Sequence, residues 1–385
     1  MRVLLISHVL DDPDGGASRI YHFLDRGLRD RGHQVTLLHL DDVRRPRGRI
    51  GLVAERVALP HLVSQAGSAA LTVSARARAM PDVVMSSSGS TYPLFRRLRQ
   101  LPRPRRPFLV NHIHGLAVAD HVANVSENVW GHRGTSLAYR AVTGPFAVRW
   151  DAKGIAAADV SVVQNLRDLG EVTDAHRLAD VRHVPPAVHP ELLAASSAIR
   201  TPPVRDPVKI LWFASWESRK GAHYVPGAFR LLRAERPDAT LTVGGTGLDG
   251  NAVRESFDSR DRAAVTVLGR ISREEHASLM RQCSIFLFPS LSEGFGLALP
   301  EAMAFGMAAV TTSTGFGADF VRDGVTGRVV APYSAHIGRA LIELAADEGR
   351  RTSMAIAGRD LARTFTVDRM VDGYEAVFES GLTRP

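Results

Sequence analysis

The stretch that decides the fold runs from Ser284 to Gly306 and reads SIFLFPSLSEGFGLALPEAMAFG. Its apolar run 285–288 is short and stops at a proline, which predicts a buried parallel strand rather than a helix. Gly294 and Gly296 bracket part of the following turn, so the backbone there can approach a ligand that any Cβ would push away. A helix is expected to begin near Leu297, because the next proline falls in its first turn, where a missing N–H costs nothing.

Two glutamates belong to this turn, Glu293 in the loop and Glu301 in the first turn of the helix. Backbone N–H groups and the positive end of the helix dipole gather at the same point, which suits a phosphate. A carboxylate beside a bound phosphate can bind the same ligand when that ligand also carries a diol, because an ionised carboxylate accepts hydrogen bonds from two hydroxyl groups. The pair therefore indicates a nucleotide-sugar site, with two solvated surface carboxylates as the alternative.

Glu293 and Glu301, with Gly-Phe-Gly and Pro300 between them, resemble the Glu-x7-Glu signature of the family 4 retaining glycosyltransferases of GT-B fold. The resemblance implies that Glu301 holds the ribose hydroxyls, whereas Glu293 contacts the donor sugar and is a catalytic residue. It also implies that the backbone of this turn binds the sugar and the diphosphate of the donor. The donor-binding residues of the turn are then Gly294, Phe295, Gly296 and Leu297.

The 385 residues are too many for one ordinary core and predict two domains. The resemblance implies an α/β protein with two doubly wound Rossmann-like domains that face each other across a cleft. We expect an acceptor-binding domain at 1–190 and a proline-rich linker at 191–207. A nucleotide-sugar-binding domain is expected at 208–364, followed by a helix, 365–385, that returns to the first domain.

No apolar run reaches membrane-spanning length, and the first apolar run is too short for a secretory signal. The single cysteine excludes an intrachain disulfide, so we expect a cytoplasmic protein. Residues 1–190 carry 25 Lys plus Arg against 17 Asp plus Glu, which accounts for the whole net charge of +8. This excess indicates either a solvated arginine-rich face or an anionic partner, namely an anionic acceptor or the inner face of an anionic membrane.

The best candidate for peripheral membrane contact is the segment 95–106, FRRLRQLPRPRR, where Leu94, Phe95, Leu98 and Leu101 have helical spacing beside arginines. Nucleic acid is not expected as a partner, because no recognised binding motif accompanies the charge.

The N-terminal segment predicts a strand at 2–6, a turn at Gly15 and Gly16, a helix, and a second strand from Val35. This is the opening of a doubly wound sheet, and its glycine turn lies where such folds bind ligands. The resemblance implies that Gly15 and Gly16 approach the diphosphate and sugar of the donor; a plain flexible turn is the alternative.

A further strand, 107–113, ends at His112 and His114, whose side chains share one face because alternate residues of a strand do. The pair admits three interpretations: half of a metal site, two structural imidazoles, or a reactive group at the carboxyl end of a parallel strand. The resemblance favours the third for His114, as a catalytic residue that contacts the donor sugar, and gives His112 no role. Gln164 and Asn165 stand where the family usually has a serine.

The second domain begins with the strand 209–213, followed by the turn ASWESRKG. The resemblance implies that Lys220 neutralises the diphosphate leaving group and is therefore catalytic and donor-binding. The chain has only three lysines and uses arginine for its other cations, so a lysine at this position indicates that a compact ammonium is needed. Ser215 stands where the family has an arginine, so Arg219 or Arg270 is the candidate for the second cation.

Together these features predict a retaining glycosyltransferase that moves a sugar from a nucleoside-diphosphate sugar to the hydroxyl of a glycan, lipid-linked or small-molecule acceptor. No cofactor or metal is expected, since the donor region has no Asp-x-Asp pair. A catalytically silent nucleotide-sugar-binding partner protein, a sugar-nucleotide epimerase and a phosphorylase remain the alternatives. The nucleobase, the sugar and the acceptor are not readable from the sequence.

Overall fold

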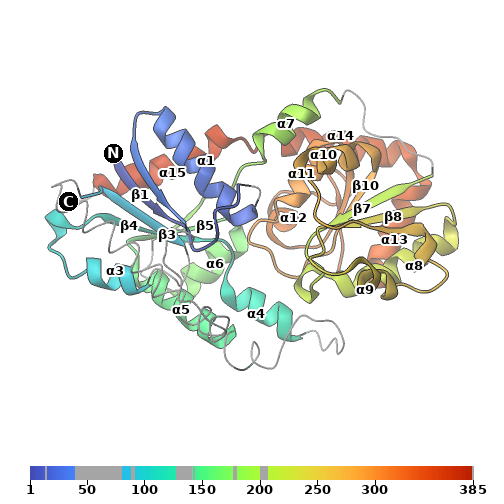
Figure 1. Cartoon of the computed structure of the whole chain (residues 1–385), viewed down its shortest axis with the longest axis horizontal. Coiled ribbons are helices and arrows are strands. Elements are labelled where there is room, and N and C mark those ends of the chain that lie inside the picture. The colour runs from blue at the N-terminus through green and yellow to red at the C-terminus, as the bar shows by residue number, and fades with distance from the viewer. Residues whose placement is uncertain are drawn as a thin grey trace. The chain divides into compact units, whose positions relative to one another are not determined.

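The computed structural model describes residues 1–13, 15–39, 80–87, 92–126, 141, 144–176, 180–199 and 207–383. The chain divides into two compact units. The first unit comprises Met1–His121, Ser136–Ala187 and Val367–Pro385, and the second comprises Val122–Thr135 and Val188–Thr366. Within the described residues, each unit contains a parallel six-stranded sheet flanked by helices (Figure 1).

The sheet of the first unit has the spatial order β2, β1, β3, β4, β5, β6. Its strands are β1 (Arg2–Ile6), β2 (Gln34–Leu38), β3 (Val83–Ser87), β4 (Phe108–Ile113), β5 (Val160–Val163) and β6 (Val181–His183). The helices are α1 (Gly16–Asp30), α3 (Tyr92–Leu98), η3 (Arg103–Arg105), α5 (Gly144–Ala157), α6 (Leu166–Ala175) and α15 (Val367–Leu382). Helix α4 (Ala117–Ser126) begins in the first unit, and its residues from Val122 on belong to the second.

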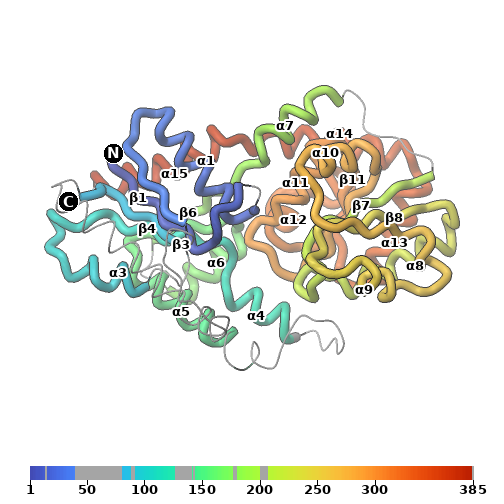
Figure 2. Tube along the Cα trace, viewed as in Figure 1, coloured from blue at the N-terminus to red at the C-terminus, as the bar shows by residue number. Residues whose placement is uncertain are grey.

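Helix α15, the last helix of the chain, completes the core of the first unit. Its residues Val371, Tyr374 and Phe378 are buried in one cluster with Leu24 and Leu28 of α1. They recur at helical spacing, so one face of α15 is apolar. Figure 2 shows the red end of the tube lying beside blue α1. The predicted return of the C-terminal helix is therefore confirmed.

The sheet of the second unit has the order β12, β11, β10, β7, β8, β9. Its strands are β7 (Lys209–Phe213), β8 (Thr240–Gly244), β9 (Val265–Val267), β10 (Ile285–Phe288), β11 (Ala308–Thr311) and β12 (Arg328–Val329). The longer helices are α7 (Pro190–Ser197), α8 (Val225–Glu235), α9 (Gly250–Glu255), α10 (Arg273–Gln282), α11 (Ala298–Ala304), α12 (Gly315–Asp319), α13 (Ser334–Ala346) and α14 (Glu348–Ala362). The 3-10 turns are η5 (Ser218–Lys220), η6 (Ala222–Tyr224) and η7 (Arg262–Ala264).

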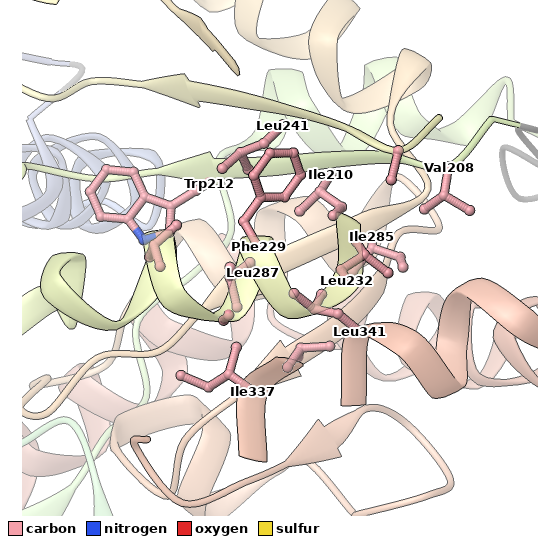
Figure 3. Packing of buried hydrophobic residues seen from close by; sticks show 14 of the residues in the cluster. Val208, Ile210, Trp212, Phe229, Leu232, Leu241, Ile285, Leu287, Ile337 and Leu341 are labelled. Atoms are coloured by element: carbon pink, nitrogen blue, oxygen red, sulfur yellow. The ribbon is translucent and has the colours of Figure 1, made fainter. Parts of the chain in front are cut away.

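One face of this second sheet packs on α8 and α13. Figure 3 shows Trp212 and Ile210 of β7 directed toward Phe229 of α8, with Ile337 and Leu341 of α13 closing the cluster. In both sheets every strand is parallel, so all carboxyl ends of a sheet meet at one edge. Ligands of such folds bind at this edge, where the order of the strands reverses. That point lies between β7 and β10 in the second unit, and between β1 and β3 in the first.

The α/β fold with two doubly wound sheets agrees with the prediction, but two local expectations differ. Helix α7 occupies the start of the segment predicted as a linker, because Leu192 is buried in the core of the second unit. Of the four apolar residues proposed for membrane contact, Leu94, Phe95 and Leu98 are buried in a core cluster of the first unit and are not available to a bilayer, whereas Leu101 is exposed. No helix among the described residues is long and apolar enough to cross a membrane.

Candidate functional site

An ion pair stands at the point where the strand order of the second sheet reverses. Glu293 follows β10 and Lys220 follows β7, and these two strands are neighbours. Lys220 Nζ lies 2.5 Å from Glu293 Oε1, and the Ser290 hydroxyl donates a hydrogen bond of 2.7 Å to the same oxygen. The structure therefore brings together two of the three residues that the sequence assigned to catalysis.

The pair is largely withdrawn from water, with side-chain exposures of 14% for Lys220 and 7% for Glu293. Burial by itself would raise the pKa of Glu293, but the charges of Lys220 and Arg219 and two hydrogen bonds outweigh it and lower that pKa. Glu293 is thus an ionised carboxylate at neutral pH. A buried ammonium beside a buried carboxylate can bind a ligand that carries an anion next to hydroxyl groups.

Gly221 allows the two turns to meet. Its φ is 68°, and a Cβ added there would lie 2.0 Å from the carbonyl oxygen of Pro289. The N–H of Leu291 donates to the carbonyl of Arg219 at 2.7 Å, which joins the same two turns. The backbone contact between the turns fixes Lys220 opposite Glu293, and only glycine fits at this position.

Helix α11 begins at Ala298 and has Pro300 and Glu301 in its first turn, as the sequence predicted. The Glu301 side chain is buried, with the residue 4% exposed. Gly296 has a φ of 83° and lies against the Phe288 ring, so its turn also requires glycine. Gly294 and Leu297 are half-buried beside it.

Phe295 has a different place from its neighbours in this turn. The residue is 2% exposed, and its ring packs with Phe316, Phe320 and Phe365 in the core of the second unit. Its side chain therefore anchors the turn, and only its backbone N–H is left as a candidate contact for a donor.

The two candidate cations differ in their relation to the ion pair. Arg219 contributes to the lowered pKa of Glu293, which places its charge near that carboxylate, and its Nε donates to Glu217 at 3.2 Å. Arg270 is exposed in the loop after β9. Ser215, in the loop after β7, is half-buried. Arg219 is therefore the better candidate for the cation that Ser215 does not provide.

In the first unit, the predicted residues Gly15 and Gly16 form the start of α1, with Gly15 as its N-cap residue. His8, which follows β1, has its Nδ1 2.6 Å from the Ser87 hydroxyl at the end of β3. The rings of His8 and His114 are 5.3 Å apart. The structure thus places His114 beside the loop that leads to the glycine turn, at the carboxyl edge of the first sheet.

His112 and His114 point the same way, with ring centroids 4.3 Å apart. Their facing nitrogens contact Gln164 Nε2, and the Tyr374 hydroxyl lies 2.5 Å from His112 Nδ1. Burial lowers the pKa of His112 to about 3 and holds the pKa of His114 well below its ordinary value, so both rings are neutral. Bonds to protein groups thus account for both nitrogens of His112, which supports the structural interpretation of that residue.

A group of side chains with the composition of a metal site lies elsewhere in the first unit. Among the described residues, one group of three side chains has its possible ligand atoms within 4.8 Å of one another, and it consists of Asp11, His22 and His39. His22 Nε2 is 2.8 Å and His39 Nε2 3.8 Å from Asp11 Oδ1. Neither His112 nor His114 belongs to it. These three residues are the ones that could hold a metal, which the sequence did not lead us to expect.

Sequence reasoning missed three polar residues of the two sites: Ser290, Gln164 and Tyr374. Gln164 carried a signal as a departure from the usual serine, and Ser290 stood inside the decisive stretch. Tyr374 carried none beyond its helical spacing, because its partner His112 lies 262 residues earlier in the chain.

Residues 199–361 match the family model described as glycosyl transferases group 1. A D-inositol 3-phosphate glycosyltransferase of Stackebrandtia nassauensis is 27% identical over 71% of this chain and 64% of its own length. An uncharacterized glycosyltransferase of Methanocaldococcus jannaschii is 32% identical over 30% of this chain. The match spans 33% of that archaeal relative.

Solved structures extend the likeness to nearly the whole chain. Sucrose-phosphate synthase from Thermosynechococcus elongatus has a TM-score of 0.74 at 17% identity and covers 98% of both chains. An Anabaena protein solved with UDP and glucose has a TM-score of 0.66 at 17% identity, over 99% of this chain and 100% of its own. At these identities the likeness is one of fold, and the fold is GT-B.

Proposed function

We propose that this chain is a retaining glycosyltransferase that acts on a nucleoside-diphosphate sugar. The proposal starts from the match of residues 199–361 to the group 1 glycosyl transferases. The sugar passes to a hydroxyl group of an acceptor. The observation that carries the proposal is the ion pair of Lys220 and Glu293 at the reversal point of the second sheet.

The ion pair suits a nucleotide-sugar donor because of what is adjacent in that molecule. Its diphosphate is bonded directly to a sugar ring that carries hydroxyl groups, so an anion and hydrogen-bond donors lie within a few ångströms. An ammonium at 2.5 Å from a carboxylate offers the complementary pair of groups. The buried carboxylate of Glu301, in the first turn of α11, is assigned to the ribose hydroxyls.

The reaction replaces one bond of the anomeric carbon with another. The acceptor oxygen bonds to the anomeric carbon while the bond from that carbon to the diphosphate oxygen breaks, on the same face of the ring. The departing diphosphate takes the proton of the acceptor hydroxyl, so no protein nucleophile is needed. Lys220, with Arg219 nearby, stabilises the negative charge that develops on the diphosphate. His114 donates a hydrogen bond to the sugar.

The acceptor is proposed to be anionic and to bind the first unit. Exposed arginines lie on α3 and η3, among them Arg96 and Arg105. A relative is named for D-inositol 3-phosphate, a polyol that carries both hydroxyl groups and a phosphate. A phosphorylated polyol in the cytoplasm is therefore the first acceptor class to try. The donor contacts assigned to Gly15, Gly16, Gly294, Gly296, Leu297 and Arg270 are part of the same proposal.

The experiment is a thermal-shift panel with UDP, GDP, ADP and dTDP sugars on the full chain and on two matched variants. A ligand at about 100 times its dissociation constant stabilises the native state by about 2.7 kcal/mol, which gives a clear shift. Lys220→Met is expected to abolish the shift. Lys209→Met, an exposed lysine at the start of β7, serves as the control and is expected to keep it.

Transfer is then measured with the donor that binds, a set of phosphorylated polyols, and NMR of the product anomer. Retained anomeric configuration supports the proposal, and an inverted product contradicts it. No shift with any nucleotide sugar would also contradict it.

A second function is favoured by Ser215, which stands in place of an arginine on the leaving-group side. In this function the protein binds a nucleotide sugar without catalysing a reaction and serves a partner protein. Such a protein would give the thermal shift but neither transfer nor slow donor hydrolysis. Introducing the cation as Ser215→Arg distinguishes the two, because it should create hydrolysis of the donor only if a lost cation is the reason for silence.

A further inference from the structure

Four side chains form a buried hydrogen-bonded network at the carboxyl edge of the first sheet. His112 and His114 come from the end of β4, Gln164 follows β5, and Tyr374 lies on α15. Gln164 Nε2 is 3.0 Å from His112 Nε2 and 3.3 Å from His114 Nδ1. Those two ring nitrogens are themselves 3.2 Å apart. One amide nitrogen thus faces two ring nitrogens at once.

Two arrangements of hydrogens fit these distances: Gln164 donates to both rings, or one facing ring nitrogen donates to the other. The amide group of Gln164 has two hydrogens and can donate one to each imidazole. Both facing nitrogens then accept, so the proton of neutral His112 is on Nδ1 and donates to the Tyr374 hydroxyl at 2.5 Å. By the same reasoning, the proton of neutral His114 is on Nε2.

His114 Nε2 is the end of the network that leads to the proposed reaction. This nitrogen is buried and has no hydrogen-bond partner among the described residues. Its ring lies 5.3 Å from the His8 ring and 6.0 Å from the Tyr21 ring, so it is held on two sides by aromatic contact. A buried N–H of this kind lacks the bond that almost all buried donors have, which indicates a ligand as its acceptor.

We propose that Gln164 is a positioning residue, which fixes His114 as the tautomer that carries its proton on Nε2 and so presents a donor to a hydroxyl of the sugar. This inference rests on the proposed function. The backbone of Gln164 is in turn held in place, because His183 Nε2 donates to its main-chain carbonyl at 3.1 Å. Asn165, the next residue, accepts from the N–H of Asp168 and caps α6.

Tyr374 extends the network to the last helix of the chain. Its hydroxyl is the acceptor that keeps the proton of His112 on Nδ1, and this leaves His112 Nε2 free to accept from Gln164. Tyr374 is also fully enclosed, at 1% exposure, in the core that α15 completes. The position of α15 thus sets the tautomer of an imidazole two hydrogen bonds away.

The first test reads the tautomer directly. Long-range proton–nitrogen correlation spectra of the 15N-histidine-labelled full chain distinguish a protonated ring nitrogen from an unprotonated one. In the wild type we expect His114 protonated on Nε2. In Gln164→Glu the carboxylate offers only acceptors, so we expect the proton of His114 on Nδ1. Gln100→Glu, an exposed glutamine of the first unit, is the control and should leave the His114 signals unchanged.

The second test measures steady-state kinetics, since a merely structural role would not separate kcat from KM. Gln164→Glu is expected to lower kcat about 100-fold, as when one preorganised donor is lost, with KM changed much less. Tyr374→Phe keeps the packing of α15 but removes the acceptor of His112, and is expected to lower kcat in the same direction by a smaller factor. It serves as the second variant if Gln164→Glu does not fold.

Two results would overturn the inference: a proton on Nδ1 of His114 in the wild type, or an unchanged tautomer and kcat in Gln164→Glu. Failure of the proposed function looks different. In that case no nucleotide sugar would bind the wild type, whereas the nitrogen spectra would still report which ring nitrogen of His114 is protonated.

Discussion

The two units have the same parallel architecture but hold their polar groups in opposite electrical states. In the second unit, Lys220 and Glu293 are buried as a pair of ions, and the pKa of the carboxyl is lowered. In the first unit, His8, His112 and His114 are kept neutral, because burial lowers the pKa of each imidazole. Both groups lie at or just after the carboxyl ends of strands.

The difference follows from what surrounds each group. A buried charge is tolerated when an opposite charge and hydrogen bonds replace water, as Lys220 and Ser290 do for Glu293. Among the described residues, no carboxylate contributes to the pKa shifts of the three imidazoles. Removal from water therefore determines that their pKa values are lowered. The same edge of the same kind of sheet therefore supplies charge in one unit and neutral hydrogen bonds in the other.

The largest effect is expected from Gly221→Ala, which separates the two turns of the charged region. The added Cβ would lie 2.0 Å from the Pro289 carbonyl oxygen, and the backbone there has a left-handed φ. We expect the free energy of unfolding of the second unit to fall by more than about 4 kcal/mol in urea titrations. Gly349→Ala, at an exposed position of α14, is the control. Equal stabilities would show that the turns need no close contact.

Removing one ion comes next. Lys220→Met leaves Glu293 buried without its partner, so the free energy of unfolding at pH 7 should fall by about 3 kcal/mol. The pKa of Glu293 should rise, and part of the lost stability should return on acidification. Urea titrations at pH 7 and pH 5 measure both effects, with Lys209→Met as the control. If stability at pH 7 is unchanged, the pair does not hold the charge of Glu293.

Acidification tests the neutral region. The unfolded chain binds protons at its imidazoles below pH 6.5, whereas native His8 does so only near pH 4. Stability of the first unit therefore falls as the pH drops through this window, by about 1.4 kcal/mol per pH unit for each imidazole. Asp168 acts in the opposite sense, because burial raises its pKa to about 7.

With three imidazoles against one carboxyl, we expect a net loss of about 3 to 4 kcal/mol between pH 7 and pH 5. Hydrogen-exchange labelling along a urea series, read separately at β4 and β10, measures it. Equal losses at the two strands would contradict the electrical difference between the units.

The smallest effect is expected from Ser290→Ala. It removes one hydrogen bond of 2.7 Å to Glu293 but leaves the ammonium in place, so the cost should be about 1.5 kcal/mol. Ser353→Ala, on the exposed side of α14, should change stability by a few tenths at most. Chemical denaturation compares the two variants. A loss as large as that of Lys220→Met would mean that the hydroxyl, not the ammonium, stabilises the carboxylate.

Local patterns in the sequence and the family resemblance were sufficient for the fold and for singling out Lys220 and Glu293, but not for the ion pair that they form. The strand, glycine turn and proline-containing helix of 285–304 lie within one stretch, and each has a local physical cause. Lys220 stood out because lysine is rare in this chain. The buried position of the Phe295 ring could not be predicted from the sequence, since a phenylalanine between two glycines gives the same pattern in an exposed loop and in a core.

The neutral region was predictable only in part. Alternation along β4 placed His112 and His114 on one face, but their partners come from β5 and α15, and no local pattern joins residues so far apart. Helix α7 was missed for a related reason. The prolines around it indicated a linker, whereas the burial of Leu192 depends on packing against the second core.

Helix α15 has a consequence for the order in which the protein can be made. The first unit is discontinuous: its sheet is encoded by the first half of the chain, whereas the helix that completes its core follows the whole of the second unit. The second unit has all its strands earlier and can close its core first. During synthesis, the face formed by Leu24, Leu28 and Val110 stays uncovered until Tyr374 and Phe378 arrive. Of the two units, the one whose strands are translated first is therefore the one that completes its core last.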